Sequence, residues 1–86
     1  MITMLVFHEV DDVDHWLGSP KRRETFGPLG ITARTFVYPE NPNRVGLIVE
    51  APDLETWQNA MQGAAAAEAM LYDGVRPETL VALVEK

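Results

Sequence analysis

His8 is the histidine whose place in the sequence best suits it to chemistry. It lies within an almost entirely apolar run, residues 2–10. Alternation along a strand would put it on the same face as Val6 and Val10. If helices cover that face, His8 could shuttle a proton or donate a hydrogen bond to an enolate or phenol. The sequence therefore makes His8 a candidate catalytic and ligand-binding residue. The alternative is a core histidine satisfied by a backbone carbonyl or a nearby acid.

The two tryptophans, Trp16 and Trp57, fall in the two segments with helical spacing. Both could line an aromatic pocket and bind a ligand there. Both could equally serve only to anchor helices to a sheet, because a tryptophan brings a large apolar surface to any core. The number of aromatic residues does not separate these two interpretations, so both tryptophans remain candidate ligand-binding residues.

Arg34 is the fourth candidate ligand-binding residue. It lies in the middle of an expected strand, on the same face as Phe36 and Tyr38. An arginine among apolar residues is costly unless its charge is paired or meets a ligand. Arg34 could hold a ligand carboxylate. The structural interpretation, which we favour, pairs it with Glu50, Glu9 or an acid of a second chain.

The other charged residues form no motif that carries a known chemistry. The basic run at residues 21–23 could attract a small anion, but such runs usually form a solvated surface. His15 sits in an acidic first turn and is interpreted as a surface residue. With no cysteine and only two histidines we expect no metal site. Residues 27–30 (GPLG) form a turn rather than a phosphate-binding loop.

The composition restricts the possible partners. The chain has 86 residues, which we take as a single domain, 1–86, and a net charge of −6. Its 13 acidic against 7 basic residues would repel a phosphate backbone, so we expect no nucleic-acid partner. No apolar run approaches the roughly 20 residues that span a bilayer, so we expect no membrane partner. The start of the chain lacks the basic segment of a signal peptide, which favours a cytoplasmic protein.

The pattern of apolar residues, turn formers and helix caps predicts an α+β fold with the order βαββαβ. The first helical segment should break at Gly18, and the second should run unbroken from Asp53 to Leu71 and close at Gly74. The last segment could also be a helix, because leucine, alanine and glutamate favour helices. Strands are expected at residues 2–10, 31–38, 44–50 and 78–85, and helices at 13–17, 21–26 and 53–71.

This order is that of a ferredoxin-like sandwich, a four-stranded antiparallel sheet with two helices on one face. Such a sheet normally alternates apolar and polar residues, yet here the strands are apolar on both faces. Leaving four or five large side chains uncovered forfeits several kcal/mol from a typical stability of about 5–15 kcal/mol. The most economical cover is the same face of a second copy. We therefore expect a homodimer whose sheets pack face to face.

Four short passages carry a resemblance to a known family. They resemble the small dimeric α/β-barrel proteins, relatives of the antibiotic-biosynthesis monooxygenases. The resemblance spans nearly the whole chain, although each passage is the strand-exit, turn and helix-cap chemistry that such a fold needs. The passages are VDDVDHW at residues 10–16, GI at 30–31, NPNRV at 41–45 and EAPDLE at 50–55.

The resemblance implies a dimeric α/β barrel with a cavity between sheet and helices, into which His8 would point. It says little about activity, because related proteins include cofactor-independent oxygenases, haem-degrading enzymes and isomerases. The haem-degrading relatives use a tryptophan and a histidine on the second helix. Ungapped placement puts Ala60 and Met70 there, so haem degradation is not expected. A thioether such as Met70 can ligate haem iron, but methionine on a helix face is more often core.

Three functions stay open. The first is a homodimer that binds a small apolar or aromatic molecule in the cavity without cofactor. The second is a cofactor-independent monooxygenase acting on a phenolic or polyketide-like substrate, with His8 as base or donor and Trp57 lining the pocket. The third is a structural or regulatory dimerisation module without ligand. A filled interior would favour the third, a dry apolar void the first, and a void where His8 meets another polar group the second.

Overall fold

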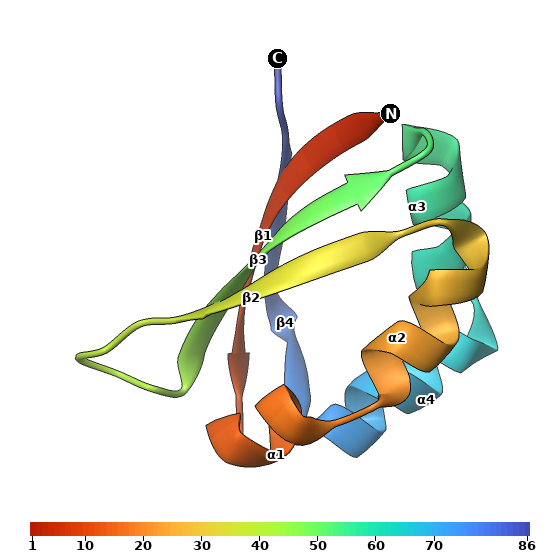
Figure 1. Cartoon of the computed structure of the whole chain (residues 1–86). Helices are drawn as coiled ribbons and strands as arrows, with labels where there is room; N and C mark the ends of the chain where they lie inside the picture. Colours follow the sequence, from red (N-terminus) through yellow and green to blue (C-terminus); the bar gives the residue numbers. More distant parts are fainter.

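The sheet has four antiparallel strands in the order β2-β3-β1-β4, and the helices cover one of its faces (Figure 1). The computed structural model describes all residues, 1–86. The predicted ferredoxin-like order is confirmed, with each crossover made of more than one short helix. The strands are β1 (Ile2–Val10), β2 (Thr32–Val37), β3 (Arg44–Ala51) and β4 (Val75–Val84). The helical segments are α1 (Val13–Gly18), α2 (Lys21–Phe26), the 3-10 turn η1 (Gly27–Leu29), α3 (Leu54–Gln62) and α4 (Ala64–Asp73).

The first crossover breaks where the sequence predicted it. The Asp12 carboxylate caps α1 by accepting a hydrogen bond from the backbone N–H of His15 at 3.1 Å. The helix ends at Gly18, and the Ser19 hydroxyl accepts a hydrogen bond from the backbone N–H of Lys21 at the start of α2. The two short helices α1 and α2 therefore turn relative to each other as they cross the sheet.

The second crossover differs from the prediction of one helix over residues 53–71. It starts as expected, with the Asp53 carboxylate accepting from the backbone N–H of Thr56 at 2.7 Å, a bond that lowers the pKa of Asp53. It then breaks at Gly63, whose backbone is extended at φ −79° and ψ 158°. Glycine costs about 1 kcal/mol inside a helix, so the break is local and cheap. The crossover closes at Gly74, a left-handed residue with φ 71°.

The last segment, β4, is a strand, so the helical alternative is wrong. It starts three residues earlier than the predicted residue 78, at Val75. The early start follows from pairing with β1, because Val75 and Arg76 lie opposite Val10 and Glu9. Pro77 lacks an N–H for the ladder and lies where the register between the two strands shifts. None of the helices has the length and apolar character needed to cross a bilayer.

The two faces of the sheet are both apolar, as the sequence predicted. On β1, Met4 and Val6 point toward the helices and are 2% exposed, whereas Leu5 and Phe7 point away and are 44% and 46% exposed. The helix-facing core is completed by α1, α3 and α4. Its largest fully buried side chains are Trp16, Met4, Val6, Val10 and Val49.

Apolar residues continue across the uncovered face, which we call the open face. Leu5 lies opposite Ile48 of β3 and Leu83 of β4, and the next row pairs Phe7 with Val81. The Phe7 ring lies over Gly46 on β3, where an added Cβ would come within 3.4 Å of the ring. No helix lies on this side (Figure 1). The open face therefore presents large side chains to solvent in a single chain.

Candidate functional site

A cavity of about 500 Å³ lies between the sheet and the helices. Its wall is mostly apolar and is built from β1, β2 and β3 on one side and from every helix on the other. Small side chains on α4 contribute to the space, because Ala69 is a buried wall residue where a larger side chain would fill the volume. The polar groups in this wall include His8, Arg22 and Asp73. A mostly apolar cavity with a few polar groups is typical of a small-molecule site.

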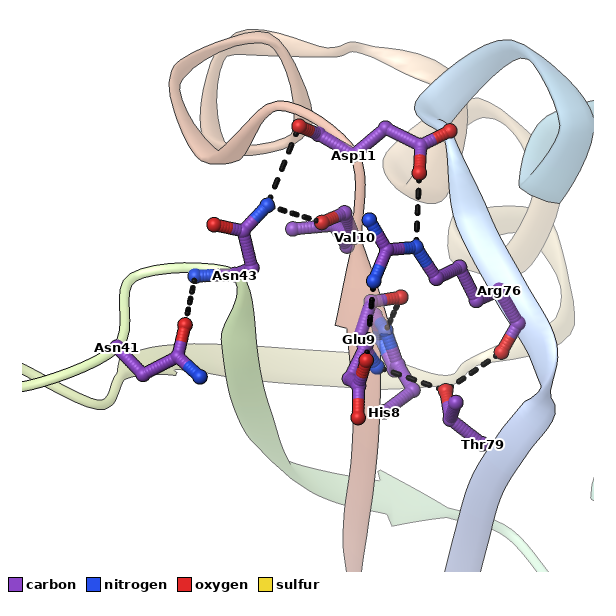
Figure 2. Close-up of polar contacts among 8 residues, drawn as sticks. All are labelled: His8, Glu9, Val10, Asp11, Asn41, Asn43, Arg76 and Thr79. Atoms are coloured by element: carbon purple, nitrogen blue, oxygen red, sulfur yellow. Dashed lines mark hydrogen bonds and ion pairs between the residues drawn. The ribbon is translucent and has the colours of Figure 1, made fainter.

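His8 is placed by an irregularity in the sheet. Phe7 lies opposite Val81 of β4, but Glu9 lies opposite Arg76, so residues 77–80 bulge outward beside His8. Figure 2 shows how Thr79 bridges the bulge, since its hydroxyl accepts a hydrogen bond from the backbone N–H of Glu9 at 2.8 Å. The same hydroxyl donates to the backbone carbonyl of Arg76 at 2.6 Å. The strand keeps its direction through the bulge, and the His8 side chain stays on the helix side.

The end of β1 after His8 is held by charged and amide groups. The Arg76 guanidinium bonds the carboxylates of Glu9 at 3.0 Å and Asp11 at 2.8 Å (Figure 2). These bonds raise the pKa of Arg76. The Asn43 side-chain amide donates to the backbone carbonyl of Val10 at 2.8 Å. All of these groups lie beside the cavity rather than in its wall, so we assign them to positioning β1 and β4.

The His8 ring is buried, with 7% of its surface exposed. It meets the Trp16 ring edge to face, with centroids 5.5 Å apart. Nδ1 lies 3.3 Å from the backbone carbonyl of Glu9, a contact in which Nδ1 donates and Nε2 is left as an acceptor. Burial lowers the pKa of His8 below its ordinary value of 6.5, and the Glu9 carbonyl only partly opposes this. His8 is therefore a neutral imidazole at neutral pH.

Two polar groups of the cavity wall were not among the predicted site residues. The guanidinium of Arg22 lies 4.9 Å from the centre of the Trp16 ring, and burial lowers the pKa of Arg22. Asp73 is 4% exposed, and its Oδ1 atom has no hydrogen-bond partner. Helical spacing carries a signal for Asp73, which follows the buried residues Ala66 and Ala69 on one face of α4. For Arg22 the sequence offers only a basic run and does not say which member turns inward.

The structure brings three of the four predicted ligand-binding residues together. His8, Trp16 and Trp57 all line the cavity. Trp57 stacks on Phe26 with ring centroids 5.9 Å apart, so it also anchors α3, as the alternative interpretation required. Met70, weighed above as a haem ligand, is another wall residue. No group of three or more histidine, aspartate, glutamate or cysteine side chains is arranged to hold a metal ion.

Arg34 is the exception, and its placement corrects the prediction that it contacts a ligand in this cavity. It lies on the open face, paired across β3 with Ile48, and its guanidinium lies 6.0 Å from the centre of the Phe36 ring. Neither of the predicted acids of its own chain pairs with it. Glu9 is bonded to Arg76, and no ion pair joins Arg34 to Glu50. The parity of β2 fixes this result, because Arg34 shares the exposed face of Phe36.

Comparison with known proteins identifies the fold. No family model matches the chain, and no curated protein matches it in sequence. Among solved structures, a presumed antibiotic biosynthesis monooxygenase from Bordetella bronchiseptica superposes with a TM-score of 0.75 at 16% identity, over 99% of this chain and 94% of that one. A second, from Nitrosomonas europaea, gives a TM-score of 0.69 at 12% identity, over 100% and 97%.

A third structure, described as an antibiotic biosynthesis monooxygenase, gives a TM-score of 0.68 at 15% identity, over 100% of this chain and 97% of that one. The likeness covers the whole chain in each case, and at such identities it establishes the fold. The chain has the ferredoxin-like fold of the antibiotic-biosynthesis-monooxygenase-like proteins, which confirms the fold that the sequence resemblance implied.

Proposed function

We propose that the protein binds a small, largely apolar or aromatic molecule in the cavity between sheet and helices. The single observation that carries this proposal is the cavity itself, about 500 Å³ of space in a domain of 86 residues. Protein interiors normally pack without voids larger than a water molecule, and an unfilled space forfeits dispersion contacts. A ligand-free dimerisation module would have no reason to keep such a space. The aromatic rings of Trp16, Trp57 and Phe26 supply a surface suited to an aromatic ligand.

We also propose that the working form is a homodimer joined through the open faces. Five apolar side chains on this face, namely Leu5, Phe7, Phe36, Val81 and Leu83, are each 44–52% exposed. Covering the exposed half of each is worth about 1 kcal/mol, or several kcal/mol per chain. A second copy offers the same surface, and a two-fold axis satisfies both sheets at once. The face also carries charges of both signs, including Arg34 and Glu50, which two copies could pair across the interface.

A cofactor-independent monooxygenase is the second candidate, and His8 is the observation that favours it. A neutral imidazole in an apolar cavity can take the proton of an acidic carbon or phenol. The resulting carbanion would add to O₂, and loss of water from the peroxide would leave a carbonyl in place of a CH₂ group. One oxygen atom then stays in the product and the other leaves as water. The names of the structural neighbours agree with this chemistry, but they are names of other proteins.

The dimer proposal predicts that a charge on the open face separates the chains. Leu83→Glu places a carboxylate in the proposed interface, so light scattering at micromolar concentration should give the mass of one chain instead of two. The matched control is Leu71→Glu on α4, which is 84% exposed and points away from the sheet. It should leave the dimer intact. A wild-type protein that is already a monomer would contradict the proposal.

The cavity proposal predicts that filling the space blocks binding. Ala69→Leu adds three carbon atoms to the buried side of α4 and should weaken the binding of naphthalene, followed by calorimetry, by about tenfold or more. Its denaturation midpoint should not fall, because the new side chain enters empty space. Ala67→Leu, on the exposed side of the same helix, is the control and should bind as wild type does. Equal binding by the two variants would place the ligand elsewhere.

Oxygen uptake separates the binder from the enzyme. With a panel of hydroxylated naphthalenes and anthrones, a monooxygenase consumes one O₂ for each substrate molecule converted, and His8→Ala should abolish most of that uptake. A protein that only binds consumes none. Uptake that His8→Ala leaves unchanged would remove His8 from the reaction even if the enzyme proposal stood.

The buried neutral state of His8 predicts a pH dependence of stability. The unfolded chain takes up a proton at His8 as the pH falls through 6.5, whereas the folded chain resists it because burial lowers the pKa. The free energy of unfolding should therefore fall between about pH 7.5 and about pH 5.5, and His8→Gln should make that fall smaller. His15→Gln, at the exposed histidine, is the control and should keep the wild-type dependence. Urea denaturation at the two pH values measures it.

A further inference from the structure

Asp73 is the polar group of the cavity that the fold itself does not explain. Its side chain is 96% removed from solvent, at 4% exposure, yet Oδ1 has no hydrogen-bond partner. Leaving a buried acceptor unpaired costs on the order of one to a few kcal/mol, and more if the group is charged. Asp73 is also the last residue of α4, where the carbonyl ends of the helix disfavour a negative charge. Two separate costs are therefore accepted at one wall residue of the cavity.

Arg22 lies in the same wall with the opposite charge. The field of Asp73 acts on Arg22, but no ion pair within 4.0 Å joins them. Arg22 rests on the Trp16 ring instead. The two groups therefore face a common space from α2 and α4 without using up each other's hydrogen-bonding capacity. Arg23 also borders the cavity, but its side chain is exposed and its charge is met by water.

His8 completes the polar end of the cavity as a neutral group. The buried charges there are then the carboxylate of Asp73 and the guanidinium of Arg22, which sum to zero. A ligand head with a net charge would improve its contact with one of them and repel the other. A neutral head that both donates and accepts hydrogen bonds can satisfy both. A hydroxyl group meets this requirement, whereas an ether oxygen can only accept.

We infer that Asp73 is a specificity-determining residue that selects ligands with an apolar ring system and a neutral hydroxyl head. The hydroxyl donates its hydrogen to Oδ1 of Asp73, and Arg22 donates to an oxygen of the same head. The ring system lies against the aromatic wall formed by Trp16 and Trp57. This inference rests on the proposed function, because it concerns the same cavity. It adds the chemical class of the ligand and a residue that reads it.

Four probes with one ring system and different heads test the inference by calorimetry on the intact protein. They are naphthylmethanol, its methyl ether, naphthoate and naphthylmethylammonium. The wild type should bind the alcohol about tenfold or more tightly than the other three, because only the alcohol satisfies Asp73 without adding charge. If none of the four binds, the proposed function and this inference both fail. If the alcohol and the ether bind equally, the cavity binds ligands but Asp73 does not read them.

Two variants separate ligand recognition from a structural role. Asp73→Leu should bind the alcohol and the ether equally, and without ligand its denaturation midpoint should rise because an unpaired buried acceptor is gone. A lower midpoint would show that the carboxylate supports the fold, which overturns the inference. Asp73→Asn should bind naphthoate about tenfold more tightly than wild type, since the repulsion is removed and an N–H donor is gained. This gain of binding cannot come from misfolding. Glu68→Gln, on the exposed side of α4, should change none of these affinities.

Discussion

The apolar character of both faces of one sheet, with helices on only one of them, is the constraint from which the other features follow. The helix side becomes the core, and the other side is left with half-exposed leucine, valine and phenylalanine side chains. Because the domain is small, its core alone supplies limited stability, so covering the open face matters more here than in a larger protein. Assembly through that face would also leave the helices free of the interface. Ligand access to the cavity would then be independent of dimer contacts.

The cavity exists because the helices are short and lightly built. Each crossover is broken, at Gly18 and at Gly63, so the helices meet the sheet at different angles rather than as two continuous rods. On α4 the buried positions toward the sheet are Ala66 and Ala69, which bring little volume. The bulky groups, Trp16 and Trp57, close the sides of the space rather than its centre. Small residues facing the sheet and large ones at the margins leave room for a ligand without opening the core to water.

The sequence predicted the elements and faces that depend on local patterns, and missed those that depend on contacts between distant segments. The alternation in β1 and β4 was enough to predict two apolar faces and the side taken by His8. The break at Gly63 was hidden because the surrounding alanines favour a helix more strongly than one glycine opposes it. Arg34 was placed on the correct face, but its distance from the cavity follows only from knowing which face the helices cover. Arg22 needed the tertiary contact with Trp16 to be singled out from its basic run.

Local rules of stability are broken in one region of this protein, and the breaks coincide in space. His8 is a buried imidazole, Arg22 a half-buried guanidinium and Asp73 a buried carboxylate at the wrong end of a helix. They arrive from β1, α2 and α4, so no single strand or helix accounts for all three. The rest of the chain follows the rules closely, with capped helices, left-handed glycines at helix ends and paired charges at the end of β1. Sequences selected only for folding remove such conflicts, and those that persist concentrate where function requires them. The convergence of three costly groups on one cavity is therefore a stronger argument for a ligand than any of the three residues considered alone.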